Sequence, residues 1–223
     1  MPVTLEERRR RLDEARLYFV CEPWPNGSDP RPLLEAALAN GADMIQLRAK
    51  DLDDDALVEA AVPFRAAADR HGALFLLNDR PDLVVACAAD GAHVGQEDMR
   101  PTDASALLPP DSLLGLSTHS GEQIETAHEL GDNAPDYISV GPIWETPTKP
   151  GRPPVGLALI DSAARTARLP WFAIGGIDPD NVGEVVAAGA RRVVVVRAIR
   201  DADDPAAATR ALRDAVEAAV EVG

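Results

Sequence analysis

Several short apolar runs of this chain end in polar and charged residues whose types suit the binding of phosphate groups. One run closes with Gln46, Leu47, Arg48, Ala49 and Lys50, which together offer one amide and two cations. Because side chains alternate along an extended strand, Gln46, Arg48 and Lys50 would point to the same side. Guanidinium and ammonium groups hold phosphate oxygens by charge-assisted hydrogen bonds, so this row predicts an anion site. Three solvated residues at a strand exit are the alternative.

A pair of carboxylates follows the next two apolar runs. Asp79 comes directly after Asn78, and Asp98 closes the segment Gly95–Asp98. If the two runs are adjacent strands, Asp79 and Asp98 can approach each other across one strand spacing. Two carboxylates, with substrate phosphates and waters, complete the octahedral oxygen shell that Mg2+ requires. We therefore predict that Asp79 and Asp98 bind Mg2+, with helix N-caps as the alternative.

The loop of residues 141–151 is stiffened by prolines and rich in hydrogen-bond donors. Thr146, Pro147, Thr148 and Lys149 lie in it. A rigid loop with two hydroxyls and an ammonium is suited to holding a phosphate or diphosphate, because little conformational freedom is lost on binding. By itself the loop could also be a polar surface turn.

Three further groups stand at the ends of apolar runs. Ser117 closes one, and because no GxSxG elbow surrounds it, we expect it to form hydrogen bonds rather than to act as a nucleophile. Gly175-Gly176 and Val196-Arg197 belong to the last two runs. Adjacent glycines let the backbone approach an anion closely, and amides after the last two strands of many α/β barrels bind phosphate.

The elements that must position these residues alternate regularly along the chain. Eight runs are apolar almost throughout, which is typical of parallel strands buried on both faces. They recur about every 25 residues, with Ala- and Leu-rich helical stretches between them, and a charged helix precedes the first. This pattern predicts a single (β/α)8 barrel domain over residues 1–223 with an extra N-terminal helix, and an open doubly wound sheet is the alternative. The predicted strands are Leu17–Cys21, Met44–Arg48, Leu74–Asn78, Gly91–Val94, Leu113–Ser117, Tyr137–Val140, Trp171–Gly175 and Arg192–Arg197.

Composition narrows the class of protein. The 223 residues carry a formal net charge of −15, which argues against a nucleic-acid or anionic-membrane surface. No apolar run approaches the length of a membrane span, and the charged N-terminus does not resemble a signal peptide. The two cysteines, Cys21 and Cys87, lie in or beside apolar runs, so we expect reduced core thiols and a cytoplasmic protein. A homodimer is a hypothesis only.

Because the C-terminal ends of barrel strands meet at one mouth, the candidate residues form two anion sites there. One combines cations and carboxylates and suits a diphosphate with Mg2+. The other is built on backbone amides and suits a monophosphate. A diphosphate held by metal and cations is a primed leaving group, so we expect substitution at the carbon that carries it. The first site comprises Arg48, Lys50, Asp79, Asp98 and Lys149, and the second comprises Gly176, Val196 and Arg197.

From Leu17 to Ala215 the chain resembles the thiamine phosphate synthase family. Each motif alone is modest evidence, but six of them occur in the family's order. They are Gln-Leu-Arg-x-Lys at Gln46–Lys50, Asn-Asp at Asn78-Asp79, Gly-Gln-x-Asp at Gly95–Asp98, Gly-x-Ser-x-His at Gly115–His119, Thr-x-Thr-Lys at Thr146–Lys149 and Gly-Gly-Ile at Gly175–Ile177.

The resemblance implies a reaction and a role for each candidate. The nitrogen of a thiazole phosphate, or of its carboxylated form, displaces diphosphate from 4-amino-2-methyl-5-hydroxymethylpyrimidine diphosphate, and thiamine phosphate is formed. By analogy Asp79 and Asp98 bind Mg2+. The pyrimidine diphosphate is held by Gln46, Leu47, Arg48, Ala49, Lys50, Asn78, Ser117 and Lys149. The thiazole phosphate is held by Thr146, Pro147, Thr148, Gly176, Val196 and Arg197.

Two residues depart from the family pattern: many members have Ser where Arg197 stands, and Pro is common where Glu145 stands. A guanidinium at position 197 would add charge to the monophosphate site. Two other functions are kept as alternatives. A related thiazole tautomerase would not need Asn78, Asp79, Asp98 and the basic row together, and a non-catalytic thiamine phosphate sensor would bind its ligand without turnover.

Overall fold

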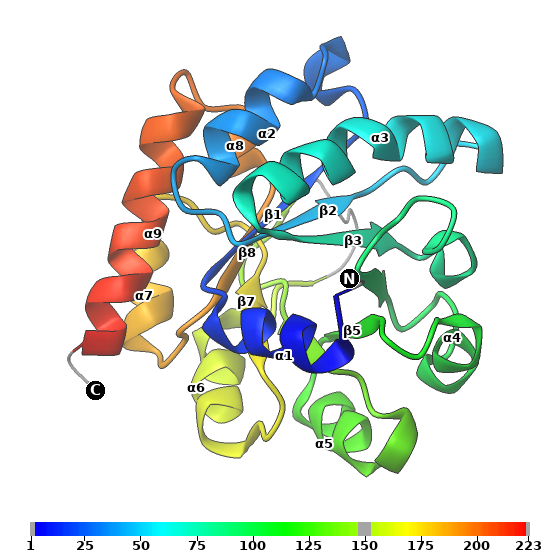
Figure 1. Ribbon diagram of the computed structural model, residues 1–223. Coiled ribbons are helices and arrows are strands. Elements are labelled where there is room, and N and C mark those ends of the chain that lie inside the picture. Colours follow the sequence, from blue (N-terminus) through cyan, green and yellow to red (C-terminus); the bar gives the residue numbers. More distant parts are fainter. Residues whose placement is uncertain (1–2, 147–152, 222–223) are drawn as a thin grey trace.

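The computed structural model describes residues 3–146 and 153–221, and its centre is a closed barrel of eight parallel strands in chain order (Figure 1). This confirms the predicted barrel. Four of the eight strand predictions match at both ends, and the others differ by one to three residues. The strands are β1 (Leu17–Cys21), β2 (Met44–Leu47), β3 (Leu74–Asn78), β4 (Gly91–Val94), β5 (Leu113–Thr118), β6 (Tyr137–Val140), β7 (Trp171–Ile174) and β8 (Val193–Val195).

Helices surround the barrel, and α1 (Leu5–Glu14) is the predicted extra helix at the N-terminus. The described connection from β3 to β4 differs from the predicted strand–helix alternation, because it holds only the 3-10 turn η2 (Pro81–Leu83). The remaining helices are α2 (Arg31–Leu38), α3 (Asp54–His71), α4 (Pro101–Leu107), α5 (Gly121–Glu129), α6 (Gly156–Thr166), α7 (Val182–Ala187), α8 (Arg197–Arg200) and α9 (Pro205–Glu221), with 3-10 turns η1 (Pro25–Gly27) and η3 (Gly131–Asn133). None of the helices in the described parts of the chain has the length and apolar character to cross a membrane.

The end of the eighth strand was predicted wrongly. The strand stops at Val195, and Arg197 opens the four-residue helix α8 instead of closing β8. The backbone leaves the extended region at Val196, where φ is −123° and ψ is −82°. A run of four valines continues the strand pattern in sequence, because β-branched residues favour strands. The turn at Val196 places Arg197 above the barrel mouth.

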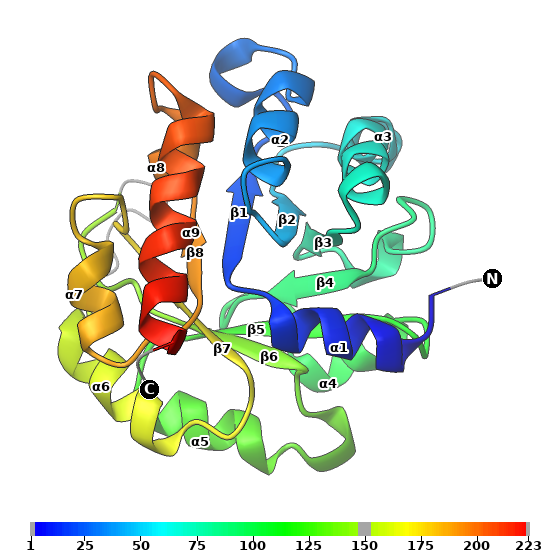
Figure 2. The ribbon, with the colours of Figure 1, turned by 60° about the vertical axis from the view of Figure 1, so that its left-hand side comes forward.

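Strand side chains alternate between two apolar layers. On β1, Phe19 and Cys21 pack in the layer between strands and helices, whereas Tyr18 packs in the barrel interior. Helix α1 closes the N-terminal end of the barrel, and its Leu12 packs with the interior cluster (Figure 2). Toward the opposite ends of the strands, interior positions become polar. These polar residues are Gln46, Asn78, His93, Ser117 and Ser139.

The end of the barrel beneath α1 is held by buried ion pairs. The Asp90 carboxylate accepts from the Phe75 backbone N–H at 2.9 Å and pairs with Arg8 and Arg65, both at 2.9 Å. Its side chain is only 8% exposed. Loss of this carboxylate would leave two guanidiniums without their shared partner in a region of low water access.

We therefore expect Asp90→Ala to lower the free energy of unfolding by about 3–5 kcal/mol, the usual cost of breaking a buried pair. The matched control is Asp103→Ala, because Asp103 pairs with Arg100 in a bridge whose side chains are 49% and 80% exposed. That change should cost less than about 1 kcal/mol. Urea unfolding midpoints compare the two, and equal losses would contradict the structural role of Asp90.

Candidate functional site

The two predicted metal ligands lie together at the ends of β3 and β4. The ammonium of Lys50 is 3.4 Å from Asp79 Oδ2 and 3.9 Å from Asp98 Oδ1, so it lies against both carboxylates. Asn78 Nδ2 donates to Asp79 Oδ2 at 2.5 Å. Burial, and next the charge of Asp98, raise the pKa of Asp79, although Lys50 opposes this. Two mutually repelling carboxylates with one partly exposed cation between them form a place where a further cation would be stabilised.

The backbone at Asp79 is held in an uncommon conformation. Its φ is +62°, in the left-handed region that non-glycine residues seldom occupy, although Asp and Asn tolerate it best. The Asp79 N–H donates to the His93 carbonyl at 2.8 Å, which ties it to β4. Asp98 Oδ2 accepts from the Gly95 N–H at 3.1 Å. Both carboxylates are thus positioned by backbone contacts at neighbouring strand ends.

The two carboxylates are suitable ligands for Mg2+, but they are few. Among the described residues no group of three or more His, Cys, Asp or Glu side chains could hold a metal. Asp79 and Asp98 offer the hard oxygen ligands that Mg2+ prefers, and Mg2+ usually completes its shell with waters and substrate phosphates. The pair therefore matches a site that is completed by a bound diphosphate.

Two arginines differ from all the others in the described parts of the chain. Every other arginine within residues 3–146 and 153–221 donates at least one hydrogen bond to a protein group. Arg48 and Arg197 are the exceptions. In a protein with net charge −15, carboxylates are abundant, so an arginine that donates no hydrogen bond to one is unusual. Arg48 follows β2 and Arg197 follows β8, so both stand at the C-terminal mouth of the barrel.

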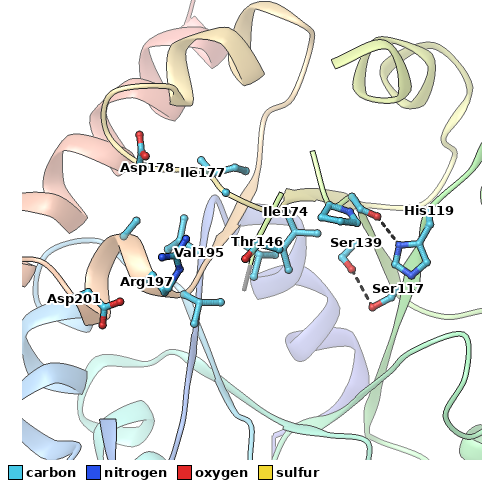
Figure 3. Close-up of a pocket in the computed structure, with 17 residues that line it drawn as sticks. Ser117, His119, Ser139, Thr146, Ile174, Ile177, Asp178, Val195, Arg197 and Asp201 are labelled. Atoms are coloured by element: carbon cyan, nitrogen blue, oxygen red, sulfur yellow. Dashed lines mark hydrogen bonds between the residues drawn. The ribbon is translucent and has the colours of Figure 1, made fainter. Parts of the chain in front are cut away.

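A cavity of about 270 Å3 opens between β5 and α8. Figure 3 shows Ser117, Ser139 and His119 on one side of it and Arg197 and Asp201 on the other. His119 Nδ1 contacts the Gly141 carbonyl at 2.5 Å. The predicted residues Ser117, Thr146, Gly176, Val196 and Arg197 all line this cavity.

Two glycines shape the floor of the cavity. Gly175 and Gly176 have φ of +108° and +72°, which side chains disfavour. A Cβ on Gly175 would lie 2.5 Å from Pro142 Cα, and one on Gly176 would lie 2.9 Å from Trp144 Cβ. The Gly175 carbonyl accepts from the Trp144 N–H at 3.1 Å. The glycines therefore let the loop after β6 pack directly on the end of β7.

Other predicted site residues are placed differently. Leu47 is buried in the layer between strands and helices, and Ala49 packs against the same layer, so only their backbones are available to a ligand. Gln46 is buried in the barrel, where its Nε2 donates to Tyr18 Oη at 2.5 Å. Pro147, Thr148 and Lys149 lie outside the described residues.

Several cavity residues were not predicted from sequence. Ser139 faces the interior on β6, opposite Ser117 on β5, and the period-two pattern of Tyr137–Val140 could have shown this. Asp201 also lines the cavity, but its carboxylate accepts from Arg200 Nε and Nη2 at 2.7 and 2.8 Å. Those hydrogen bonds lower the pKa of Asp201. No sequence pattern indicated that Arg200 would take hydrogen bonds to this carboxylate and leave Arg197 only a charge interaction with it.

The sequence model of thiamine monophosphate synthase matches residues 17–199. The chain belongs to this family. A thiamine-phosphate synthase of Thermobifida fusca is 47% identical over 218 residues, which cover 96% of this chain and 98% of the relative. Another, of Thermus thermophilus, is 50% identical over 202 residues, covering 89% and 96%.

Solved structures agree with this family membership. The thiamine phosphate pyrophosphorylase of Pyrococcus furiosus superposes with a TM-score of 0.82 at 30% identity, covering 96% of this chain and 99% of that one. A geranylgeranylglyceryl phosphate synthase of Thermoplasma acidophilum, at 14% identity and a TM-score of 0.70, shares the fold alone. In this member of the thiamine monophosphate synthase family, the carboxylate pair, Arg48 and Arg197 lie at the C-terminal face of the barrel.

Proposed function

We propose that this chain is a transferase that makes thiamine phosphate from 4-amino-2-methyl-5-hydroxymethylpyrimidine diphosphate and 4-methyl-5-(2-phosphoethyl)thiazole or its carboxylated form. The observation that carries the proposal is the presence, at one barrel mouth, of two arginines that donate no hydrogen bond to a described group. Arg48 follows β2, which neighbours the strand that precedes Asp79, and Arg197 lines the cavity. A reaction with one diphosphate and one monophosphate substrate needs two such anion sites.

The proposed reaction is a substitution at the methylene carbon of the pyrimidine. The bond from this carbon to the diphosphate oxygen breaks, and the diphosphate leaves with the electron pair. The lone pair of the thiazole nitrogen then forms the new carbon–nitrogen bond, which leaves a positive charge on the thiazolium ring. Stabilising the departing charge and holding the two rings in line are the tasks that remain for the protein.

The residues that follow β2, β3 and β4 are suited to stabilising the diphosphate as it leaves. Asp79 and Asp98 would hold Mg2+, which neutralises diphosphate charge when bound. Arg48 and Lys50 add two positive charges beside it, and Asn78 orients Asp79 through its amide. Lys149, which lies outside the described residues, is predicted to act with them.

The residues around the cavity are suited to binding the pyrimidine and thiazole rings and the phosphate of the thiazole. Ser117 at one side would contact the pyrimidine. At the other side Gly176, Val196 and Arg197 would hold the phosphate of the thiazole, with Thr146 nearby. Pro147 and Thr148 remain predicted contributors outside the described residues.

A turnover assay tests the proposal. Purified protein is given both substrates, each substrate alone, and both substrates with a chelator, while thiamine phosphate and diphosphate are measured. We expect product only with both substrates and Mg2+. Conversion of a thiazole phosphate tautomer without the pyrimidine would indicate a tautomerase. Binding of thiamine phosphate without turnover would indicate a sensor, and either result would overturn the proposal.

Arg197 gives a further prediction. Because Arg200 takes hydrogen bonds to the Asp201 carboxylate, the Arg197 guanidinium interacts with Asp201 only through its charge. It donates no hydrogen bond to a described residue and is available to the phosphate. We expect Arg197→Ala to raise the KM for the thiazole phosphate about tenfold, which corresponds to about 1.4 kcal/mol. Arg165→Ala, at a site where the arginine pairs with Asp161 on the surface of α6, is the charge-matched control. An unchanged KM would leave only the backbone of residue 197 to bind phosphate.

A further inference from the structure

A chain of hydrogen bonds crosses the barrel interior and ends at Ser117. Tyr18 Oη is 3.1 Å from Tyr137 Oη, and Tyr137 Oη is 3.1 Å from His93 Nδ1. On the other side of the imidazole, His93 Nε2 is 3.0 Å from Ser117 Oγ. All four side chains are at most 8% exposed. The substitution chemistry proposed above uses none of the three residues before Ser117.

The chain of hydrogen bonds has a direction, which is set by the Gln46 amide beside Tyr18. Gln46 Nε2 donates to Tyr18 Oη at 2.5 Å. A phenol that accepts this bond uses its single proton toward Tyr137, whose own proton then goes to His93 Nδ1. With Nδ1 as acceptor, the neutral imidazole carries its proton on Nε2 and donates it to Ser117 Oγ.

The direction decides what Ser117 can offer to a ligand. Its oxygen accepts from His93, and the Ser139 hydroxyl is a further donor at 3.4 Å. The proton of Ser117 is therefore left for the cavity that this residue lines. At the other end of the chain, Gln46 uses its amide nitrogen on Tyr18, which leaves its Oε1 as an acceptor. The two ends thus have opposite hydrogen-bonding character.

The space for this chain depends on one glycine. A Cβ at residue 115 would lie 2.4 Å from His93 Nδ1 and 2.4 Å from Tyr137 Oη. Real Cβ atoms do not come that close to a neighbour, so any larger residue at Gly115 would push the tyrosine and the imidazole apart. The family motif Gly115–His119 therefore holds both the hydroxyl at the end of the chain and the gap through which the chain passes.

We infer that Tyr18, Tyr137 and His93 are positioning residues that fix Ser117 as a hydrogen-bond donor toward the cavity and so select a ligand with a ring-nitrogen acceptor there. The inference rests on the proposed function for the identity of that ligand. An aminopyrimidine offers ring nitrogens as acceptors and an amino group as donor. A donor at Ser117 matches a ring nitrogen and rejects a ring that presents a donor at this place.

The hydrogen-bond direction can be measured on the protein without substrates. The protein has four histidines, so a long-range proton–nitrogen NMR spectrum of protein labelled with 15N-histidine is simple. The spectrum of His93→Gln then assigns the signals of His93. We expect neutral His93 with its proton on Nε2. A proton on Nδ1 would reverse every bond in the chain and overturn the inference, whether or not the protein makes thiamine phosphate.

Steady-state kinetics tests the consequence for the ligand. Tyr137→Phe removes the donor to His93 Nδ1, so Ser117 can turn its proton toward the imidazole. We expect the KM for the pyrimidine diphosphate to rise about fivefold to tenfold, as for loss of one hydrogen bond. The KM for the thiazole phosphate should stay within about twofold. Tyr18→Phe should act in the same direction, which covers the case that one variant does not fold.

Thr209→Val is the matched control, because Thr209 is fully buried in α9 and donates to the Pro205 carbonyl far from this chain. It should lower thermal stability as Tyr137→Phe does and leave both KM values unchanged. If either tyrosine variant folds and keeps the wild-type KM for the pyrimidine diphosphate, the positioning role is wrong. If the wild-type protein shows no turnover, the proposed function fails instead, and the NMR result still decides the direction of the chain.

Discussion

Replacing Asp79 or Asp98 by asparagine should lower turnover at saturating substrates roughly 100-fold or more, the scale on which losing one group that stabilises developing charge slows an enzyme. Each change removes one carboxylate from the pair that lies against Lys50. With less Mg2+ at the site, the departing diphosphate keeps more of its charge and leaves more slowly. Excess Mg2+ should restore activity only in part, because a ligand is missing.

Asparagine is the informative replacement at position 79. The φ of +62° is tolerated by Asn but strains Ala, so Asp79→Asn changes charge with little effect on the backbone. Burial and the charge of Asp98 raise the pKa of Asp79, so its charged form is disfavoured in the folded state. The stability linked to this group is present at low pH and is lost as the pH rises through the raised pKa.

At neutral pH the metal-free Asp79→Asn variant should therefore be at least as stable as the wild type. Thermal unfolding with and without Mg2+ and diphosphate measures this, and the rise in Tm on adding them should be smaller in the variant. The exposed Asp69→Asn, on α3, controls for the change in net charge. Near-wild-type turnover in both site variants would remove the metal assignment. A variant that lost activity through unfolding would show a lowered Tm.

Much of the fold could be predicted because the barrel strands are short, apolar and evenly spaced. Leu17–Cys21 matches at both ends, since its neighbours Arg16 and Glu22 are charged. The end of β8 could not be predicted, because the valines favour a strand while the backbone turns at Val196 into α8. Where a strand gives way to a helix depends on packing across the barrel mouth, which a local pattern does not contain.

The sequence could predict which residues form the site, but not which hydrogen bonds those residues make. Motifs gave Asp79 and Asp98 as a pair, and the structure brings both within reach of Lys50. The sequence could not show that Arg200 occupies Asp201, or that Tyr137 bonds His93 two strands away. Both facts depend on the strand register and on competition among many charges in space.

Arg48→Ala should raise the KM for the pyrimidine diphosphate about tenfold to a hundredfold and slow the chemical step. Arg48 is a half-buried residue directly after β2, and its guanidinium donates no hydrogen bond to the described residues. Its loss should therefore leave no protein carboxylate unpaired there, so the change in affinity reports mainly on the ligand. A charge-assisted contact to a phosphate oxygen is worth about 1.5–3 kcal/mol, which gives the expected range.

Calorimetry with each substrate separates the two anion sites. Binding of the pyrimidine diphosphate to Arg48→Ala should weaken strongly, while binding of the thiazole phosphate should change less, because that phosphate is assigned to the Arg197 side of the cavity. Arg197→Ala should show the opposite order, and Arg165→Ala should change neither, since Arg165 pairs with Asp161 on the surface of α6. If Arg48→Ala weakened the thiazole phosphate more than the diphosphate, the two sites would be assigned the wrong way round. Because neither arginine donates a hydrogen bond to a described residue, the contrast between their two variants decides which anion each one holds.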